Sequence, residues 1–422
     1  MSCLYFTSES KDTAPERSLL RSFVIPGLVF ATAFCVVYLL ELKPGQGIAR
    51  DGAGLVVGRD FLNFWMYGKS AFSAAPWDFY NLHHYQQALA QLLGPGYSQE
   101  NWSYPPSVML IAAPFGLIGY WSALAIWTAG GIGLFVAALR RYRASSFVLI
   151  AALASPAAMF VLITGQNALV TTALLLTCFA LLDKRPWLAG ILIGCLTLKP
   201  QLGLLIPLLL IASSRWRVFV SASATTAAIA AATTLLFGMQ SWVAFATDGL
   251  ATQAQVLADP QHIATPSYPT VYMNLHGVGL SVTAAMALQG CAALAAVAAV
   301  IWAFRRRRDA DPLLLFALFT AATATALPYL LVYDTLPMNT AMLLLLAAGR
   351  MDARGRGVAM LVYWLPLLQV WMGNLHLPGS ALIAPLFAAW LVMELRRAPR
   401  AGTDDRPAGQ PAWSATRGTD LP

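Results

Sequence analysis

The chain has 422 residues, of which 58% are hydrophobic and only 11% are charged, and its mean hydropathy is +0.62. An average soluble domain carries about 25% charged residues, so this composition excludes a water-soluble protein; unpaired backbone in lipid is costly, so the apolar segments must be helices. The net charge of +8 does not indicate nucleic-acid binding, because the basic residues stand in short groups between apolar runs.

The first apolar run, 22–41, follows a polar segment and is longer than a signal-peptide core. No small-residue cleavage pattern ends it, so we expect a retained signal anchor, with residues 1–21 as a cytoplasmic N-terminal tail. The five cysteines are scattered without paired or metal-ligand spacing, which predicts neither a disulfide nor a zinc site.

A bilayer core about 30 Å thick needs about 20 apolar residues per crossing. The apolar runs predict about twelve full or near-full spans, at 22–43, 121–139, 146–163, 167–182, 187–199, 202–213, 217–237, 279–303, 311–331, 335–348, 357–373 and 379–395. A shorter run at 106–119 is predicted to be a partial or re-entrant helix, broken near Pro114. The predicted fold class is an all-α polytopic membrane protein, with one transmembrane domain over 22–395 and amphipathic helices on its outer face.

The basic residues give the orientation. If 106–119 does not cross, 22 of the 27 Lys and Arg residues fall on one side. The other side keeps five, namely Lys43, Arg50, Arg59, Lys69 and Lys199. By the positive-inside rule, both termini are then cytoplasmic, which places the chain in a cytoplasmic (inner) membrane. The large outward loops are 44–105 and 238–278, where aromatic residues such as Trp65 predict an interfacial belt. The tail 396–422 is predicted to be disordered.

The first outward loop contains the candidate catalytic residue. The segment from Gly58 to Gly68 has an amphipathic helical pattern, which predicts a helix on the membrane surface with Asp60 at its start. The alternative for Asp60 is an ordinary helix N-cap. Because the loop ends in Tyr104-Pro105-Pro106, which fixes an extended entry into the partial helix, we expect Asp60 and Tyr104 to frame a site at the water–lipid boundary. Arg59 is a substrate-binding candidate beside them.

Further polar residues recur on the same side of the membrane. Gln166 and Asn167 interrupt two apolar runs, and Lys199 is the one basic residue in the run 187–213. An ionisable group in the membrane faces a cavity or a partner, so an anionic ligand such as a lipid phosphate suits Lys199; the alternative is a snorkelling lysine. Tyr333 and Asp334 end the span 311–331, where Asp334 could also cap the next helix.

Other polar motifs carry less weight. All five histidines fall in outer segments, and His262 and His276 are kept as substrate-binding candidates although each fits a solvated loop residue. The run Arg305–Arg308 is interpreted as a stop signal or an anionic-lipid contact. Asp309-Ala310-Asp311 has the spacing with which nucleotide-sugar transferases hold a metal, but it lies on the cytoplasmic side and is assigned to capping.

An ordered set of residues resembles a known family. The set comprises Gly58-Arg59-Asp60-Phe61, Tyr67-Gly68, Tyr104-Pro105-Pro106, Pro114, Trp127, Ser155-Pro156, Gly165-Gln166-Asn167, Gly190 to Gly194, Lys199-Pro200 and Arg215-Trp216-Arg217. Over roughly residues 22–350 this resembles glycosyltransferase family 87, membrane enzymes of the GT-C class similar in plan to bacterial polyprenol-phosphate-mannose-dependent α-1,2-mannosyltransferases. The chain departs from the histidine pair that many members carry, since 329–334 reads Tyr-Leu-Leu-Val-Tyr-Asp, which leaves the sugar and acceptor open.

The resemblance implies a GT-C-type helix bundle and an outward site. Its sugar donor would be carried on polyprenyl phosphate, the acceptor would be a lipid or glycan, and the reaction would invert the anomeric carbon without a nucleotide. Asp60 would be the general base and Lys199 would contact the donor phosphate. No cofactor is implied, since the lipid-linked sugar is a substrate, and a divalent metal is left open.

The sequence therefore predicts a membrane glycosyltransferase that moves a hexose, mannose favoured, and that contacts membrane lipids. The main alternative is a polytopic transporter or flippase, which would also have about twelve spans and broken helices. Transporters tend to show internal repeats and polar groups near the midplane, whereas here the polar residues gather at the outer boundary. A structural membrane subunit is a third alternative.

Overall fold

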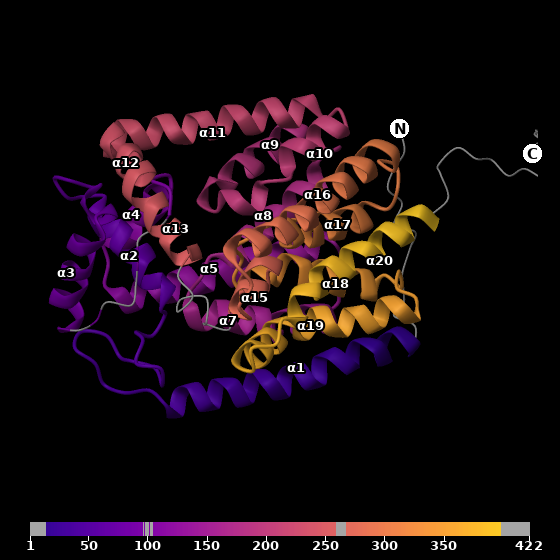
Figure 1. Cartoon of the computed structure of the whole chain (residues 1–422), viewed down its shortest axis with the longest axis horizontal. Helices are drawn as coiled ribbons and strands as arrows, with labels where there is room; N and C mark the ends of the chain where they lie inside the picture. The colour runs from indigo at the N-terminus through magenta and orange to yellow at the C-terminus, as the bar shows by residue number, and fades with distance from the viewer. Residues whose placement is uncertain (1–13, 96, 98–100, 102–103, 259–266, 398–422) are drawn as a thin grey trace, which may run out of the picture.

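A computed structural model describes residues 14–95, 97, 101, 104–258 and 267–397. Within these ranges the chain is helical, and the only β-type pairing is two isolated bridges, Lys43 with Arg50 and Arg50 with Val56. Figure 1 shows a bundle in which α1 and α11 run along opposite sides, with α2, α3, α4 and α12 gathered at one end. The start of α1 and the end of α20 lie at the other end.

Five helices are long and apolar enough to cross a bilayer, over Arg21–Leu40 of α1 (Ala14–Leu40), α5 (Tyr120–Arg141), α11 (Trp216–Phe237), α16 (Val282–Arg306) and Gly379–Arg397, which joins η6 (Gly379–Leu382) to α20 (Ile383–Arg397). A sixth is formed if α6 (Ser146–Leu153) and α7 (Pro156–Thr164), which meet at a 56° bend, count as one span. Such side chains as Val29, Leu40 and Leu235 on these helices are 65 to 85% exposed, which suits lipid and not water.

Shorter apolar helices complete the bundle: α8 (Ala168–Leu181), α9 (Pro186–Gly194) with η2 (Cys195–Leu198), η3 (Pro200–Gly203) with α10 (Ile206–Ala212), α17 (Pro312–Ala326), and η5 (Val332–Thr335) with α18 (Leu336–Ala347). The last long helix, α19 (Ala353–Asn374), contains Pro366. Every predicted apolar window thus coincides with a helix or a broken helix, but only five or six of the described helices are both long and apolar enough for a crossing. The number of twelve spans stays a prediction.

The first outward loop folds into α2 (Asp60–Ser70), η1 (Asp78–Tyr80) and α3 (Leu82–Leu93), followed by α4 (Val108–Gly116). At about 1.5 Å per residue, the nine residues of α4 reach about half of the hydrocarbon thickness or less, in keeping with a partial helix. The predicted break is wrong in detail, because Pro114 lies inside α4 and the helix ends at Gly116. The second loop contributes α12 (Met239–Ala244), the π-helical turn η4 (Phe245–Gly249), α13 (Leu250–Ala258) and α15 (Val271–Gly277).

The prediction that α2 is an amphipathic helix on the surface is wrong. Every residue from Phe61 to Gly68 is buried, because the loop and α4 cover the face that was expected to meet water. Phe64 packs on Phe115 and Trp127, with ring centroids 5.6 and 4.3 Å apart. Trp65 is not an interfacial belt residue, since it is 6% exposed and its Nε1 donates to the Ile118 carbonyl at 3.0 Å. The start of α2 is therefore held inside the protein.

Two glycines allow α2 and α4 to cross closely. A Cβ atom at Gly116 would overlap the backbone of Gly68 and Lys69, and one at Gly68 would overlap the backbone of Ala112 and Gly116. Main-chain atoms at a helix crossing cannot turn aside as a flexible side chain can.

We expect Gly116→Ala to lower the melting temperature of the detergent-solubilised protein, because overpacking of this kind typically costs about 1–3 kcal/mol. Gly130→Ala on α5 is the matched control, since a Cβ there meets nothing within 4 Å and alanine favours a helix. Differential scanning fluorimetry checks both variants. A Gly116→Ala protein as stable as the wild type would contradict the close crossing.

Candidate active site

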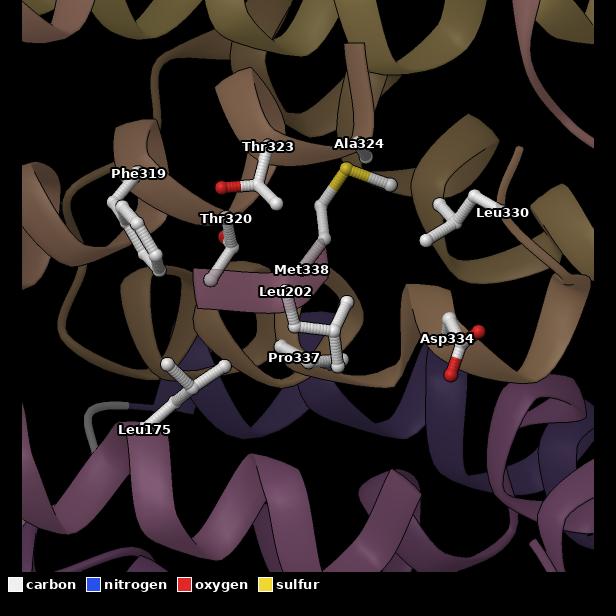
Figure 2. Close-up of a pocket in the computed structure, with 10 residues that line it drawn as sticks. All are labelled: Leu175, Leu202, Phe319, Thr320, Thr323, Ala324, Leu330, Asp334, Pro337 and Met338. Carbon is white, nitrogen blue, oxygen red and sulfur yellow. The ribbon is translucent and has the colours of Figure 1, made fainter. Parts of the chain in front are cut away.

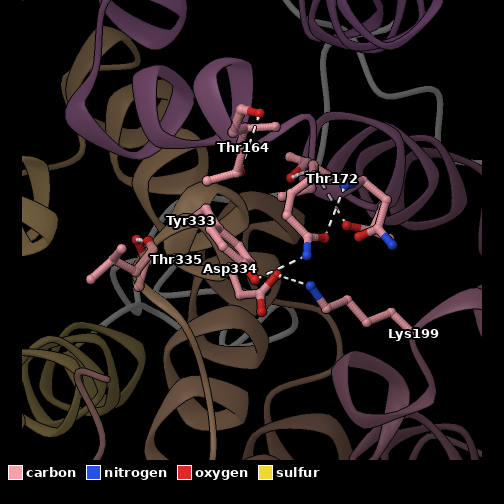
Figure 3. Close-up of polar contacts among 12 residues, drawn as sticks. Thr164, Thr172, Lys199, Tyr333, Asp334 and Thr335 are labelled. Carbon is pink, nitrogen blue, oxygen red and sulfur yellow. Dashed lines mark hydrogen bonds and ion pairs between the residues drawn. The ribbon is translucent and has the colours of Figure 1, made fainter. Parts of the chain in front are cut away.

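Four separate segments bring the predicted site residues together. Asp60 begins α2, and Gln166 and Asn167 form the turn between α7 and α8. Lys199 stands between η2 and η3, while Tyr333 and Asp334 lie in η5. Figure 3 shows the Lys199 ammonium directed at Asp334, with Tyr333 beside them. Residues spread over more than 270 positions of the sequence thus share one polar cluster.

A chain of hydrogen bonds runs through Gln166. The Tyr104 hydroxyl donates to Gln166 Oε1 at 3.0 Å, and Gln166 Nε2 donates to the Tyr333 hydroxyl at 3.0 Å. Gln166 is 8% exposed and Tyr333 4%. Because burial raises the pKa of Tyr104, which lies in the loop before α4, its hydroxyl stays protonated and remains a donor. The Gln166 amide is therefore fixed in orientation.

Local backbone geometry places Gln166 against the start of α2. Helix α7 ends at Gly165, which takes a left-handed φ of 63° as its C-cap. A Cβ on Gly165 would overlap Phe61 Cβ and come within 3.1 Å of the Gly58 carbonyl. Only glycine allows the turn after α7 to approach the loop before α2 this closely.

The Asp60 side chain faces this network. The polar side chains of Gln166 and Tyr333 and the charges of Lys199 and Arg59 all favour its ionised form. Asp60 lies between α1 and α4, outside the candidate spans. Burial raises its pKa above the ordinary value, while the Gln166 amide and the positive charge of Lys199 act in the opposite sense. The N-cap of α2 is Arg59, so the capping alternative for Asp60 is wrong. Protein surrounds the carboxyl group, although the residue as a whole is only partly buried.

Lys199 and Asp334 form a buried ion pair. Lys199 Nζ lies 2.6 Å from Asp334 Oδ1, and the two residues are 4 and 5% exposed. The ammonium also lies 4.9 Å from the centroid of the Tyr333 ring. The snorkelling alternative for Lys199 is therefore wrong. So is the capping alternative for Asp334, since the N-cap of α18 is Thr335 and no side-chain capping bond is formed there.

Asn167 presents an open acceptor at the same place. Asn167 is 3% exposed, and its Oδ1 accepts no hydrogen bond from any of the described residues. A buried polar atom of this kind costs free energy unless a ligand or water satisfies it. A ligand hydroxyl is a suitable partner.

A small cavity adjoins Asp334 on the interior side. It is lined mainly by apolar side chains, together with Thr320 and Thr323 of α17, and Figure 2 shows Asp334 at one edge. The space that is open to the centre of a water molecule is about 10 Å³, so the cavity can hold one water molecule and is too small for a substrate.

Two predicted candidates lie elsewhere or outside the described residues. His276 ends α15, with Nδ1 2.8 Å from the Leu280 carbonyl and its ring stacked on Tyr272, so its contacts belong to that loop. His262 falls in 259–266, outside the described residues. The capping assignment for the Asp309-Ala310-Asp311 motif is confirmed, because Asp311 Oδ1 accepts the Leu313 N–H at 2.9 Å at the start of α17.

Arg59 has a partner that the sequence did not suggest. Its Nε and Nη2 both lie 2.7 Å from Asp51 Oδ2, and Asp51 is 1% exposed. Arg59 has φ +32° and ψ −101°, a conformation that costs a non-glycine residue on the order of 1–3 kcal/mol. The Asp51-Gly52-Ala53-Gly54 turn pattern was the one available signal for Asp51.

The cluster combines one acid, one cation and neutral donors. In the part of the chain that the structure describes, no three His, Cys, Asp or Glu side chains converge to hold a metal. Lys199 acts electrostatically on both Asp60 and Asp334. The arrangement can accept a proton at Asp60 and stabilise an anion near Lys199.

We expect Lys199→Met to lower the melting temperature strongly, because removing one partner of a buried pair leaves the other unpaired at a cost of about 3–5 kcal/mol. The double variant Lys199→Met/Asp334→Leu should recover most of that loss. Lys184→Met, at an exposed position between α8 and α9, is the control and should change little. A single variant as stable as the double would show that the ion pair is not formed.

Comparisons with known proteins agree with this site. The family model of glycosyltransferase family 87 matches residues 102–333. That range includes Tyr104, Gln166, Asn167, Lys199 and Tyr333, whereas Asp60 precedes it and Asp334 follows it directly. No curated protein and no solved structure matches the chain. Because the match covers more than half of the sequence, the chain belongs to glycosyltransferase family 87 and is a membrane glycosyltransferase.

Proposed function

We propose that this glycosyltransferase moves a hexose, with mannose favoured, from polyprenyl phosphate to a hydroxyl of a lipid or glycan acceptor, with inversion of the anomeric carbon. The observation that carries the proposal is a partly buried aspartate, Asp60, held against Gln166 and Tyr333 beside the buried cation Lys199. These are the two charges that a direct displacement with a phosphate leaving group needs.

Asp60 is proposed as the general base. As the acceptor oxygen attacks the anomeric carbon, Asp60 takes the hydroxyl proton, and the bond from that carbon to the phosphate oxygen breaks with its electron pair leaving on the phosphate. A base with a raised pKa accepts a proton more readily than an exposed aspartate does. The Gln166 and Tyr333 side chains, which favour the ionised carboxyl group, are proposed to orient the carboxylate for this step.

Lys199 is proposed to stabilise the departing phosphate. An ammonium has three N–H donors, and one of them is directed at Asp334. The others are available for phosphate oxygens, while Asp334 keeps the side chain in place and lowers the cost of a buried cation. Because Asp334 is engaged by Lys199, it is not a free nucleophile of the kind that a retaining mechanism requires.

Sugar and acceptor hydroxyls are proposed to meet the neutral residues. Asn167 Oδ1 is a buried acceptor with no donor among the described residues, and Tyr104 borders the same turn through Gln166. A site that pairs with a specific hydroxyl rejects sugars that lack it, because its own polar atom is then left unsatisfied. We therefore assign selection among hexoses to this side of the site.

The site is proposed to face outward from the cytoplasmic membrane, with both termini in the cytoplasm. All its residues stand at helix ends or breaks, and α2 and α4 lie at the end of the bundle opposite the end of α20 (Figure 1). The excess of basic residues in the other set of loops supports this orientation. The alternative of a transporter gains no support, because the family model that matches the chain is one of glycosyltransferases.

We expect Asp60→Asn to abolish transfer of radiolabelled mannose from a short-chain polyprenyl-phosphate donor while donor binding is kept. The same variant should be more stable than the wild type at neutral pH, because burial disfavours the ionised acid, and this gain should vanish as the pH falls through the pKa of Asp60. Thin-layer analysis of lipid extracts and thermal melts give the two readings. Transfer by the Asp60→Asn protein at the wild-type rate would refute the role of Asp60.

The pH dependence of kcat/KM should show an acid limb above the ordinary aspartate pKa of about 3.9, because burial raises the pKa of Asp60. Activity is lost as the pH falls through that limb, where Asp60 becomes protonated and can no longer act as a base. In the charge-neutral double variant Lys199→Gln/Asp334→Asn, the limb should move to higher pH, since the positive charge of Lys199 favours ionised Asp60. If the acid limb of the kcat/KM profile lies at the same pH in the double variant as in the wild type, Asp60 is not the titrating group.

A further inference from the structure

The loop that precedes α2 is an ordered turn built around Asp51. Asp51 Oδ1 accepts the N–H groups of Ala53 and Leu55 at 2.9 and 3.1 Å, while Oδ2 binds Arg59. Asp51 is 1% exposed, so both of its oxygens are used inside the protein. No role in ligand binding accounts for a carboxylate that is buried in this way.

Neighbouring contacts fix the rest of the turn. The Tyr120 hydroxyl donates to the Val57 carbonyl at 2.6 Å, and the Arg59 N–H donates to the Val56 carbonyl at 2.8 Å. Two successive residues then take a positive φ, Gly58 at 87° and Arg59 at 32°. Glycine adopts such angles freely, whereas arginine adopts them only where its surroundings hold it.

The backbone at Arg59 sets the direction of Asp60. The first turn of α2 is tied to it, because Phe61 N–H donates to the Gly58 carbonyl at 2.6 Å and Leu62 N–H donates to the Arg59 carbonyl at 2.9 Å. The same Gly58 carbonyl lies against Gly165, next to Gln166. A rotation at Arg59 would therefore move Asp60 away from Gln166 and Tyr333.

We propose that Asp51 is a positioning residue of the transferase: by its ion pair with Arg59 it holds that residue in its strained backbone conformation, so that the Asp60 carboxylate points at Gln166 and Tyr333. This inference rests on the proposed role of Asp60 as the base. It assigns Arg59 a structural partner in Asp51, and the substrate-binding role expected for Arg59 is replaced by one in shaping the turn.

Substitutions at residue 59 can distinguish the effect of its backbone conformation from the effect of the arginine side chain. Glycine at 59 accepts a positive φ without any partner, so Arg59→Gly keeps the backbone direction and removes the need for Asp51. Alanine at 59 has a Cβ atom, which disfavours a positive φ, and it cannot form the ion pair with Asp51 that would hold that φ. Asp51→Asn keeps an oxygen for Ala53 and Leu55 but presents an amide to the Arg59 guanidinium.

The test compares steady-state mannose transfer by the purified full-length protein in proteoliposomes. We expect Asp51→Asn and Arg59→Ala to lower kcat about 10-fold, which is roughly the effect of 1.4 kcal/mol on the barrier, with the donor KM changed less than about twofold. Arg59→Gly should keep several times more turnover than Arg59→Ala. The kcat of the double variant Asp51→Asn/Arg59→Gly should match that of Arg59→Gly, because glycine adopts a positive φ without an ion pair to hold it.

Asp183→Asn is the matched control. It breaks another arginine–aspartate pair, in which Arg215 Nε and Nη2 lie 2.9 and 3.0 Å from the two oxygens of an exposed Asp183, beyond the opposite end of α8 from Asn167. It should keep the wild-type kcat. A double variant as slow as Asp51→Asn alone, or an Asp51→Asn protein with the wild-type kcat, would overturn the inference.

Hydrogen exchange gives a reading that does not depend on activity. The amides of Phe61 and Leu62 should exchange faster in Asp51→Asn than in the wild type, and Arg59→Gly should restore their protection in the double variant. Unchanged protection in Asp51→Asn would also overturn the inference. If the wild type transfers no mannose from this donor, or if Asp60→Asn remains active, the proposed function fails, whereas the exchange result still decides the role of Asp51.

Discussion

The buried ion pair between Lys199 and Asp334 is the interaction on which the site depends. Each charge is costly inside the protein without the other, so the break between η2 and η3 must stay against η5. Tyr333 is adjacent to Asp334 and accepts a hydrogen bond from Gln166, which also receives one from Tyr104. One ion pair thereby fixes the relative positions of four segments, and the partly exposed Asp60 is added to a framework that is already rigid.

Broken helices are what make such a framework possible within a hydrophobic bundle. Continuous helices satisfy their own backbone groups and present side chains to lipid, as α1 and α11 do along opposite sides of the bundle (Figure 1). Interrupted ones expose backbone and polar side chains at their ends, which is tolerated only where protein or a cavity surrounds them. The turn at Gly165 and the break at Lys199 are of this kind. The outer loop and α4 then cover α2, so that the acid stands at the boundary of a buried region.

Much of the site could be predicted from the sequence because isolated polar residues in apolar runs are conspicuous. Gln166, Asn167, Lys199 and Asp334 were identified in this way, and the structure places them in one cluster. The partner of Lys199 could not be predicted, since 135 residues separate it from Asp334. The burial of α2 depends on aromatic contacts with Phe115 and Trp127. The spacing of apolar residues within 58–68 does not reveal such contacts with distant parts of the chain. Asp51 was missed because an acid in a polar loop looks solvated. The number of twelve spans stays a prediction, because apolar windows do not tell where proline and glycine shorten a helix.

The separation of Lys199 from Asp334 has a consequence for synthesis. A ribosome that adds about 5–20 residues per second needs roughly 7–27 s to make the 135 residues between them. During that interval the lysine lacks Asp334, the carboxylate with which it forms its ion pair in the folded protein, and a buried ammonium without its partner is unfavourable. We therefore expect the break around Lys199 to reach its final position only after the segment with Asp334 has been made, so that the site is completed late in synthesis.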